Sequence, residues 1–170
     1  NEHGIPENSM AAFQRAVDKG YGIELDVHLT ADNQLVVFHD DTLTRMCGIN
    51  RKISGFLYSY LQQLRLLGTG EGIPLFKDVL ALVDGKVPLI IELKVDGSNQ
   101  NLLCPLVWQL LSGYKGSYCI ESFHPFVLQW FKRHQPQVVR GQLSCNFFKE
   151  IPHCDIVLFL MSNLMTNFFT

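Results

Sequence analysis

Two acidic residues on one predicted strand, Glu24 and Asp26, are the clearest candidates for chemistry in this sequence. They belong to the segment GIELDV, whose other members are glycine or apolar residues. Side chains of a strand alternate between its two faces, so the two carboxylates share one face. The segment is too apolar for an edge strand, and two buried carboxylates side by side destabilise a fold unless a cation lies between them. The pair therefore predicts half of a site for a hard divalent metal; the alternative is ordinary charge on an exposed strand.

The same spacing of charged residues recurs in a second predicted strand, PLIIELK, as Glu92 and Lys94. Glu92 would supply a third carboxylate ligand, and Lys94 would place a positive charge near an anionic substrate. Three carboxylates suit Mg²⁺ or Ca²⁺, which are hard ions that take oxygen ligands. Zinc fits less well, because the cluster has no cysteine and only one convincing histidine. The alternative for Glu92 is a buried ion pair with a neighbouring residue.

His39 follows the apolar run VVF at the end of a predicted strand, one hairpin away from the acidic pair. This place predicts a catalytic role in proton transfer, with Asp40 or Asp41 fixing the tautomer of the ring. Those two acids could equally cap the following turn. His28, which shares the face of Asp26, is a minor candidate. The other histidines lack such a setting: His3, His124, His134 and His153.

Helical and extended patterns alternate along the chain. Strands are expected at 23–29, 35–38, 88–94, 117–123 and 138–144, and helices at 10–17, 58–66, 75–83, 101–111, 125–134 and 156–168. The alternation predicts parallel βα units in an α/β protein. Polar residues gather at the carboxyl ends of these strands, where a (β/α)8 TIM barrel has its active site. About five strands, against the eight of a closed barrel, lead us to expect an incomplete barrel without its first and last strands.

The composition fits a single globular domain over residues 1–170, because 47% of the residues are hydrophobic and 18% are charged. A net charge of −2 gives no signal for nucleic acid as a partner. The five cysteines match no zinc or disulfide spacing, which favours reduced thiols and a cytoplasmic location. The apolar stretch near the carboxyl end is too short and too often interrupted for a stable membrane span. The oligomeric state is left open.

Six segments occur in the order and spacing of a known protein family: PEN-S-MAAF, GIELDV-LT-D, VVFHDDTL-R, IPLF-DVL, PLIIELK and SF-P. On these segments, which run from Pro6 to about Ser144, the chain resembles the glycerophosphodiester phosphodiesterase family, in its short cytosolic bacterial form. Members of this family are metal-dependent TIM barrels that hydrolyse glycerophosphodiesters to glycerol 3-phosphate and an alcohol. The resemblance implies metal ligands at Glu24, Asp26 and Glu92, a catalytic His39, and substrate-binding roles for Lys94 and Glu7.

The resemblance also implies a two-step acid–base hydrolysis of a small-molecule glycerophosphodiester. The substrate's glycerol hydroxyl would attack the phosphorus, and water would then open the cyclic phosphate, with one histidine as base and one as acid. His39 is expected to be the acid. The family's first catalytic histidine belongs to a His-Arg-Gly motif, which His3 does not match, so we expect that histidine before Asn1. Two alternatives stay open: phospholipase D-like activity on lysophospholipids, and a catalytically silent barrel used for binding.

Overall fold

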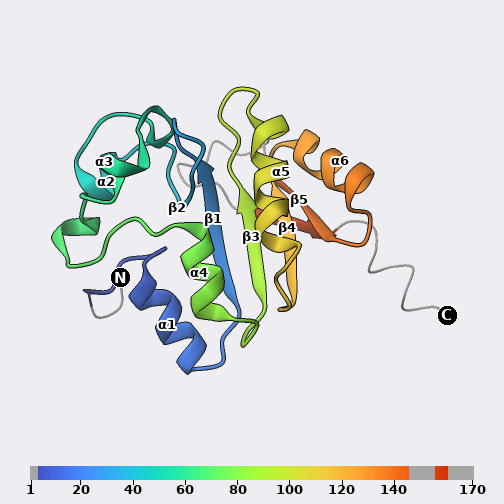
Figure 1. Cartoon of the computed structure of the whole chain (residues 1–170), viewed down its shortest axis with the longest axis horizontal. Coiled ribbons are helices and arrows are strands. Elements are labelled where there is room, and N and C mark those ends of the chain that lie inside the picture. Colours follow the sequence, from blue (N-terminus) through green and yellow to red (C-terminus); the bar gives the residue numbers. More distant parts are fainter. Residues whose placement is uncertain (1–3, 146–155, 161–170) are drawn as a thin grey trace.

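The computed structural model describes residues 4–145 and 156–160, whose strands form one six-stranded sheet (Figure 1). The strands are β1 (Ile23–Leu29), β2 (Leu35–Val37), β3 (Leu89–Leu93), β4 (Tyr118–Ser122), β5 (Val139–Cys145) and β6 (Ile156–Leu160). They lie in the order β2-β1-β3-β4-β5-β6. The four central strands are parallel, whereas β2 and β6 pair antiparallel with their neighbours at the two edges. The predicted hairpin and parallel βα units are therefore confirmed.

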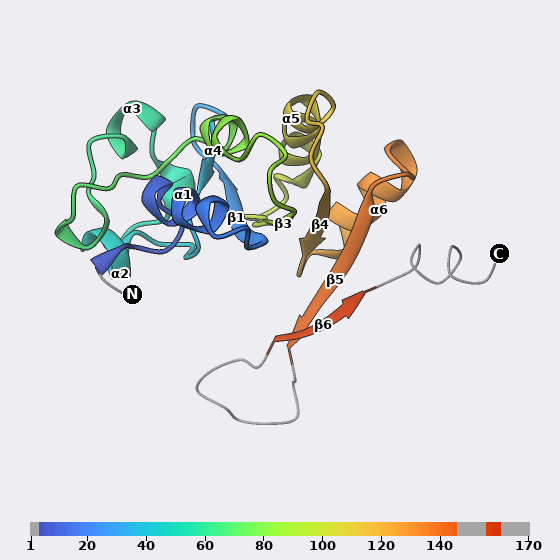
Figure 2. The same ribbon diagram turned by 90° about the horizontal axis from the view of Figure 1, so that it is seen from below.

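Helices of the described residues lie on one face of this sheet (Figure 2). The longer ones are α1 (Met10–Asp18), α4 (Phe76–Val83), α5 (Gln100–Leu111) and α6 (Pro125–His134). Short helical turns fill the connection before α4: α2 (Thr44–Cys47), η2 (Ile53–Gly55), α3 (Tyr58–Leu61) and η3 (Leu66–Gly68). No helix in the described ranges is long and apolar enough to cross a membrane.

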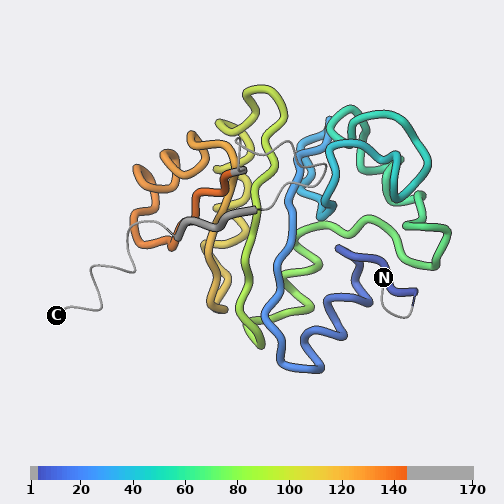
Figure 3. Tube along the Cα trace, turned by 180° about the vertical axis from the view of Figure 1, so that it is seen from behind, coloured from blue at the N-terminus to red at the C-terminus, as the bar shows by residue number. Residues whose placement is uncertain are grey.

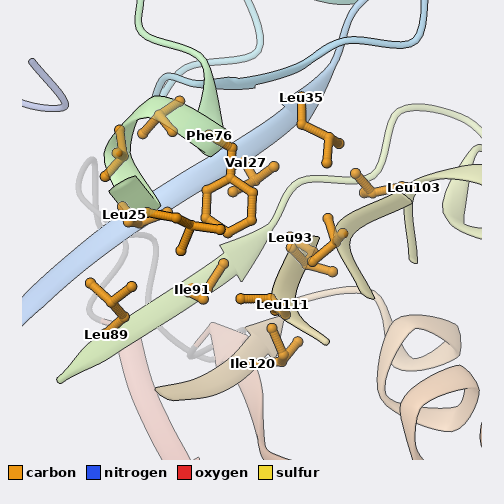
Figure 4. Close-up of a cluster of buried hydrophobic side chains, with 14 of the residues drawn as sticks. Leu25, Val27, Leu35, Phe76, Leu89, Ile91, Leu93, Leu103, Leu111 and Ile120 are labelled. Carbon is orange, nitrogen blue, oxygen red and sulfur yellow. The ribbon is translucent and has the colours of Figure 1, made fainter. Parts of the chain in front are cut away.

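The main core lies between the helices and the sheet (Figure 4). Leu25 of β1 and Ile91 of β3 are fully buried there, and Phe76 of α4 packs against the same cluster. In parallel strands the residues that stand in register point to the same side, and Leu25 stands opposite Ile91. The residues next to these two along each strand point to the other face of the sheet, which is turned toward the viewer in Figure 3.

A second apolar cluster lies under the short helices that follow β2. Val36, Phe38 and Leu43 are buried in it, together with residues of α2, α3 and η3. The backbone N–H of Phe38 donates a hydrogen bond of 2.9 Å to the carbonyl oxygen of Asp26. This cluster and this hydrogen bond fix the end of β2, and with it the residue that follows, His39.

Two expected helices differ from the structure. The segment expected as a helix from Tyr58 to Leu66 is helical only to Leu61, because the chain then turns so that Leu66 also enters the second cluster. The tail expected as a helix over 156–168 begins with β6, and residues 161–168 lie outside the described ranges. A short apolar run fits either structure in sequence, and the open edge of β5 offers backbone partners that favour the strand.

Adjacent residues on β3 should differ sharply in their contribution to stability. We expect Ile91→Ala to lower the free energy of unfolding by about 3 kcal/mol, because it leaves a cavity in the closed core. Ile90, which is 36% exposed on the opposite face, is the matched control. Ile90→Ala should cost less than about 1 kcal/mol. Urea unfolding of the two variants measures the difference, and equal losses would mean that the helices do not cover the face assigned to them.

Candidate functional site

Three acidic residues form a row across the middle of the sheet, on the face opposite the helices. Asp26 of β1 stands in register with Glu92 of β3, which stands in register with Glu121 of β4. All three are buried, with Asp26 only 1% exposed. Glu24 lies two residues before Asp26 and so projects from the same face. The structure therefore confirms the separation of acidic and apolar faces along β1.

The predicted ligands Glu24, Asp26 and Glu92 come together in space. One carboxylate oxygen from each residue lies within 4.8 Å of the other two. The ammonium of Lys94 reaches into the same cluster, 2.9 Å from Asp26 Oδ1 and 2.9 Å from Glu92 Oε2. The other oxygen of Asp26 accepts a hydrogen bond of 2.9 Å from the side chain of Asn8. Asn8 is free to make this contact because the next residue, Ser9, caps α1.

Negatively charged side chains outnumber positively charged ones in this partly buried cluster. Burial, followed by repulsion from Asp26 and Glu92, raises the pKa of Glu24 to about 7. Burial also raises the pKa of Glu92 to about 7, although Lys94 opposes the shift. Burial and the charge of Asp26 raise the pKa of Glu121 as well. One lysine therefore offsets only part of the repulsion.

The three carboxylates fit a hard divalent cation. Asp26 Oδ1 is buried at the centre of the cluster and is contacted there by the ammonium of Lys94, so a positive charge fits at this point. All the candidate ligands are carboxylate oxygens, which Mg²⁺ and Ca²⁺ prefer. Both ions usually complete their coordination with water, and Glu24 lies on the more exposed side of the cluster.

His39 belongs to a separate polar chain at the end of β2. Its Nδ1 lies 2.7 Å from Asp40 Oδ1, so Asp40 is the acid that can fix the tautomer of the ring. Arg45 in α2 donates two hydrogen bonds of 2.8 Å to the Asp40 carboxylate and a third to Glu7. These hydrogen bonds to Arg45 hold the pKa of Asp40 below its ordinary value. Glu7 therefore lies beside His39 and Asp40, and not in the group that Glu24, Asp26 and Glu92 form.

A pocket of about 360 Å³ opens next to the acidic cluster at the carboxyl ends of β3 and β4. Glu92 and Lys94 line it from one side, and Asp41 and His124 also face it. The buried Nδ1 of His124 has no hydrogen-bond partner among the described residues. His124 had no predicted role, because only the pairing of β3 with β4 brings it to the same pocket as Lys94. The minor candidate His28 is buried, with Nε2 3.5 Å from the carbonyl oxygen of His39.

Sequence reasoning missed two further residues of this region. Arg45 was not singled out, since its partners Glu7 and Asp40 are joined to it only by the fold. Glu121, near the end of another expected strand, was not placed in the site. The comparison of YCIES with LIIEL is the signal that could have found it, because both segments carry an acid at the matching strand position.

The sequence matches one protein family over most of its length. The sequence model of the family described as "Glycerophosphoryl diester phosphodiesterase family" matches residues 1–147. A glycerophosphodiester phosphodiesterase of Caldanaerobacter subterraneus is 40% identical over 152 residues, which cover 82% of this chain and 61% of the relative. The rat protein Lysophospholipase D GDPD1 is 39% identical over 122 residues, which cover 64% of this chain and 38% of the relative. The chain thus spans less than two thirds of the length of either relative.

Solved structures show the same arrangement of strands and helices. A phosphodiesterase from Oleispira antarctica, in complex with the product sn-glycerol-3-phosphate, matches 81% of this chain and 60% of its own, with a TM-score of 0.75 and 26% identity. A glycerophosphodiester phosphodiesterase from Parabacteroides distasonis matches 81% of this chain and 58% of its own, with a TM-score of 0.70 and 32% identity. These structures are TIM barrels, so the described sheet and helices are part of such a barrel, and the predicted fold class is confirmed.

The raised pKa values of Glu24 and Glu92 should make the effect of a cation on stability depend on pH. Both are about 7 in the folded chain, against an ordinary value of 4.5. The folded state then holds protons that the unfolded chain has lost, so the cation-free protein becomes less stable as pH rises from about 4.5 through about 7. A cation competes with those protons. At a concentration about 100 times Kd, Ca²⁺ or Mg²⁺ should stabilise the fold by about 2.7 kcal/mol near pH 8 and far less near pH 5.

Thermal unfolding with each cation and with a chelator measures this effect. Glu92→Gln should remove most of the stabilisation near pH 8, whereas Asp84→Asn, an exposed acid at the end of α4, should retain it. A cation effect of equal size at both pH values would contradict binding to these carboxylates.

Proposed function

The chain belongs to the glycerophosphoryl diester phosphodiesterase family, and we propose that it hydrolyses glycerophosphodiesters to glycerol 3-phosphate and an alcohol. The observation that carries this proposal is a carboxylate cluster on β1 and β3 together with a histidine held by an acid just after β2, the strand that pairs with β1. Barrels of this kind place their chemistry at the carboxyl ends of the parallel strands, where Glu92 lines a pocket. The relatives named for this activity and the neighbour with bound glycerol 3-phosphate support the same substrate class.

In this proposal Glu24, Asp26 and Glu92 hold one divalent cation, Mg²⁺ or Ca²⁺. When bound, the cation supplies positive charge to the phosphoryl oxygens on which negative charge builds in the transition state. The carboxylates orient it at the edge of the pocket that Glu92 also lines. Lys94 lines the same pocket and adds a second positive charge, so its ammonium would bind a non-bridging oxygen of the phosphodiester.

His39 would act as the acid that protonates the leaving alkoxide. Its Nδ1 is engaged by Asp40, so the proton that is transferred resides on Nε2, the other ring nitrogen. Asp40 is itself held by two hydrogen bonds from Arg45, which keep the carboxylate from rotating away. Glu7 would support the site through Arg45, since it accepts a hydrogen bond from the same guanidinium.

A second candidate activity is hydrolysis of lysophospholipids at the head-group side of the phosphate, in the manner of a phospholipase D. The 39% identity to the rat protein Lysophospholipase D GDPD1 favours it. Both activities would use the same carboxylates and histidine, and they differ in whether the glycerol carries an acyl chain. Comparing lysophosphatidylcholine with glycerophosphocholine as substrates decides between them, because the first yields lysophosphatidic acid and the second yields glycerol 3-phosphate.

The proposed function predicts release of glycerol 3-phosphate from glycerophosphocholine that depends on a divalent cation. We expect activity with Mg²⁺ or Ca²⁺, complete loss with excess chelator, and recovery when the cation is restored, because the carboxylate cluster binds no substrate without it. A coupled assay with glycerol-3-phosphate dehydrogenase measures the product. Activity that a chelator leaves unchanged would refute a role for the carboxylates as metal ligands.

Removal of the proposed acid should affect turnover much more than folding. We expect His39→Ala to lower kcat by roughly 10²- to 10⁴-fold, the usual contribution of a positioned general acid. The control is His134→Ala, which removes an exposed histidine at the end of α6. It should keep nearly full activity. A folded His39→Ala protein that hydrolyses glycerophosphocholine at the original rate would show that the proton donor is another residue.

A further inference from the structure

The ammonium of Lys94 contacts two carboxylate oxygens of the proposed cation cluster. Its ammonium lies 2.9 Å from Asp26 Oδ1 and 2.9 Å from Glu92 Oε2, and both carboxylates belong to the proposed cation cluster. A divalent cation takes carboxylate oxygens at about 2.0–2.6 Å. An ammonium held against the same oxygens would repel it strongly at that separation. A cation bound to these two oxygens would therefore displace the Lys94 ammonium from its observed position.

The lysine has a long flexible side chain, so it can leave without a change in the backbone. Four carbons separate its backbone from the charge, and the side chain is 16% exposed at the edge of the pocket. A buried or half-buried ammonium still requires a partner of opposite charge. An ammonium that leaves Asp26 and Glu92 therefore needs another acidic partner nearby.

Glu121 is the acid that meets the requirements. It is 6% exposed, and its side chain makes no hydrogen bond and no ion pair with any described residue. Asp26 and Glu121 stand in register with Glu92 on the two strands that flank β3. Lys94 directly follows the end of β3, two residues beyond Glu92, so its side chain projects from the same face with Asp26 diagonally on one side and Glu121 diagonally on the other. Its positive charge already acts on Glu121, where it opposes the rise in pKa.

We propose that Glu121 is a positioning residue for Lys94, which pairs with Asp26 and Glu92 when the site lacks a cation and with Glu121 when a cation occupies Glu24, Asp26 and Glu92. The exchange keeps the ammonium beside the cation, facing the pocket where the phosphodiester would bind. It also gives a role to a buried acid next to the cluster whose side chain has no ion-pair partner among the described residues. The proposal rests on the proposed function for its catalytic meaning, whereas the exchange itself needs only a cation.

A double-mutant cycle on cation affinity tests the exchange. The variants are Glu121→Gln, Lys94→Met and the pair, each titrated with Ca²⁺ and with Mg²⁺ by calorimetry on the full chain. If Glu121 acts through Lys94, Glu121→Gln should weaken cation binding by about tenfold when Lys94 is present and by less than about twofold when it is absent. The shape of glutamine matches that of glutamate, so the substitution removes the charge and retains the packing. Glu121→Asp should restore part of the affinity.

Two outcomes would overturn the proposal. If Glu121→Gln weakens binding equally with and without Lys94, Glu121 acts on the cation by its own charge. If it weakens binding in neither background, Glu121 takes no part. Asp84→Asn, which removes one exposed negative charge at the end of α4, is the control for net charge and should leave affinity unchanged.

A second measurement does not depend on how well the Lys94 variant folds. Nitrogen-15 spectra of the lysine side chains, recorded before and after addition of Ca²⁺, should show the Lys94 signal shift in the original protein and in Asp84→Asn. In Glu121→Gln the cation-bound signal should show faster exchange with water, and an identical signal in both proteins would contradict the pairing. These titrations involve no turnover, so a protein that exchanges partners but does not hydrolyse glycerophosphocholine would refute only the proposed function.

Discussion

Repulsion among acidic side chains on one face of the sheet is the constraint on which the site depends. The register of the parallel strands places Asp26, Glu92 and Glu121 side by side, where little water reaches them. Such an arrangement destabilises a fold unless positive charge lies among the acids. Lys94 supplies one charge, and burial together with repulsion still raises the pKa of Glu24 and of Glu92 to about 7. Further positive charge, from protons or from a cation, would therefore stabilise the cluster.

Two separate apolar clusters hold the two parts of the site. The main core packs the other face of β1 and β3 against the helices, and so fixes the spacing of the acids. The second cluster packs the end of β2 under the short helices, and so fixes His39 and its partner Asp40. The antiparallel pairing of β2 with β1 and the backbone hydrogen bond from Phe38 to Asp26 join the two parts. The distance between histidine and cluster therefore depends on how firmly β2 pairs with β1.

Local patterns in the sequence were sufficient for most of the fold. Strict alternation in IELDV and the continuous run LIIEL specify strands, and the spacing of apolar residues specifies α1, α4, α5 and α6. The alternation also assigns Glu24 and Asp26 to one face without any knowledge of the neighbours. The local pattern does not decide between helix and strand at 156–160, because the apolar run there suits both. The open edge of β5 favours the strand.

The sequence by itself determined which residues are acidic, basic or apolar along each strand. This was enough to predict that Glu24, Asp26, Glu92 and Lys94 belong to an ion-binding site. Only the tertiary structure decided which strands are neighbours and in what register. The pairing of the strands places Glu121 beside Glu92. The fold also brings Arg45 into contact with Glu7 and Asp40. The physical reason is that register and long-range ion pairs arise from packing between segments far apart in sequence, which no local periodicity encodes.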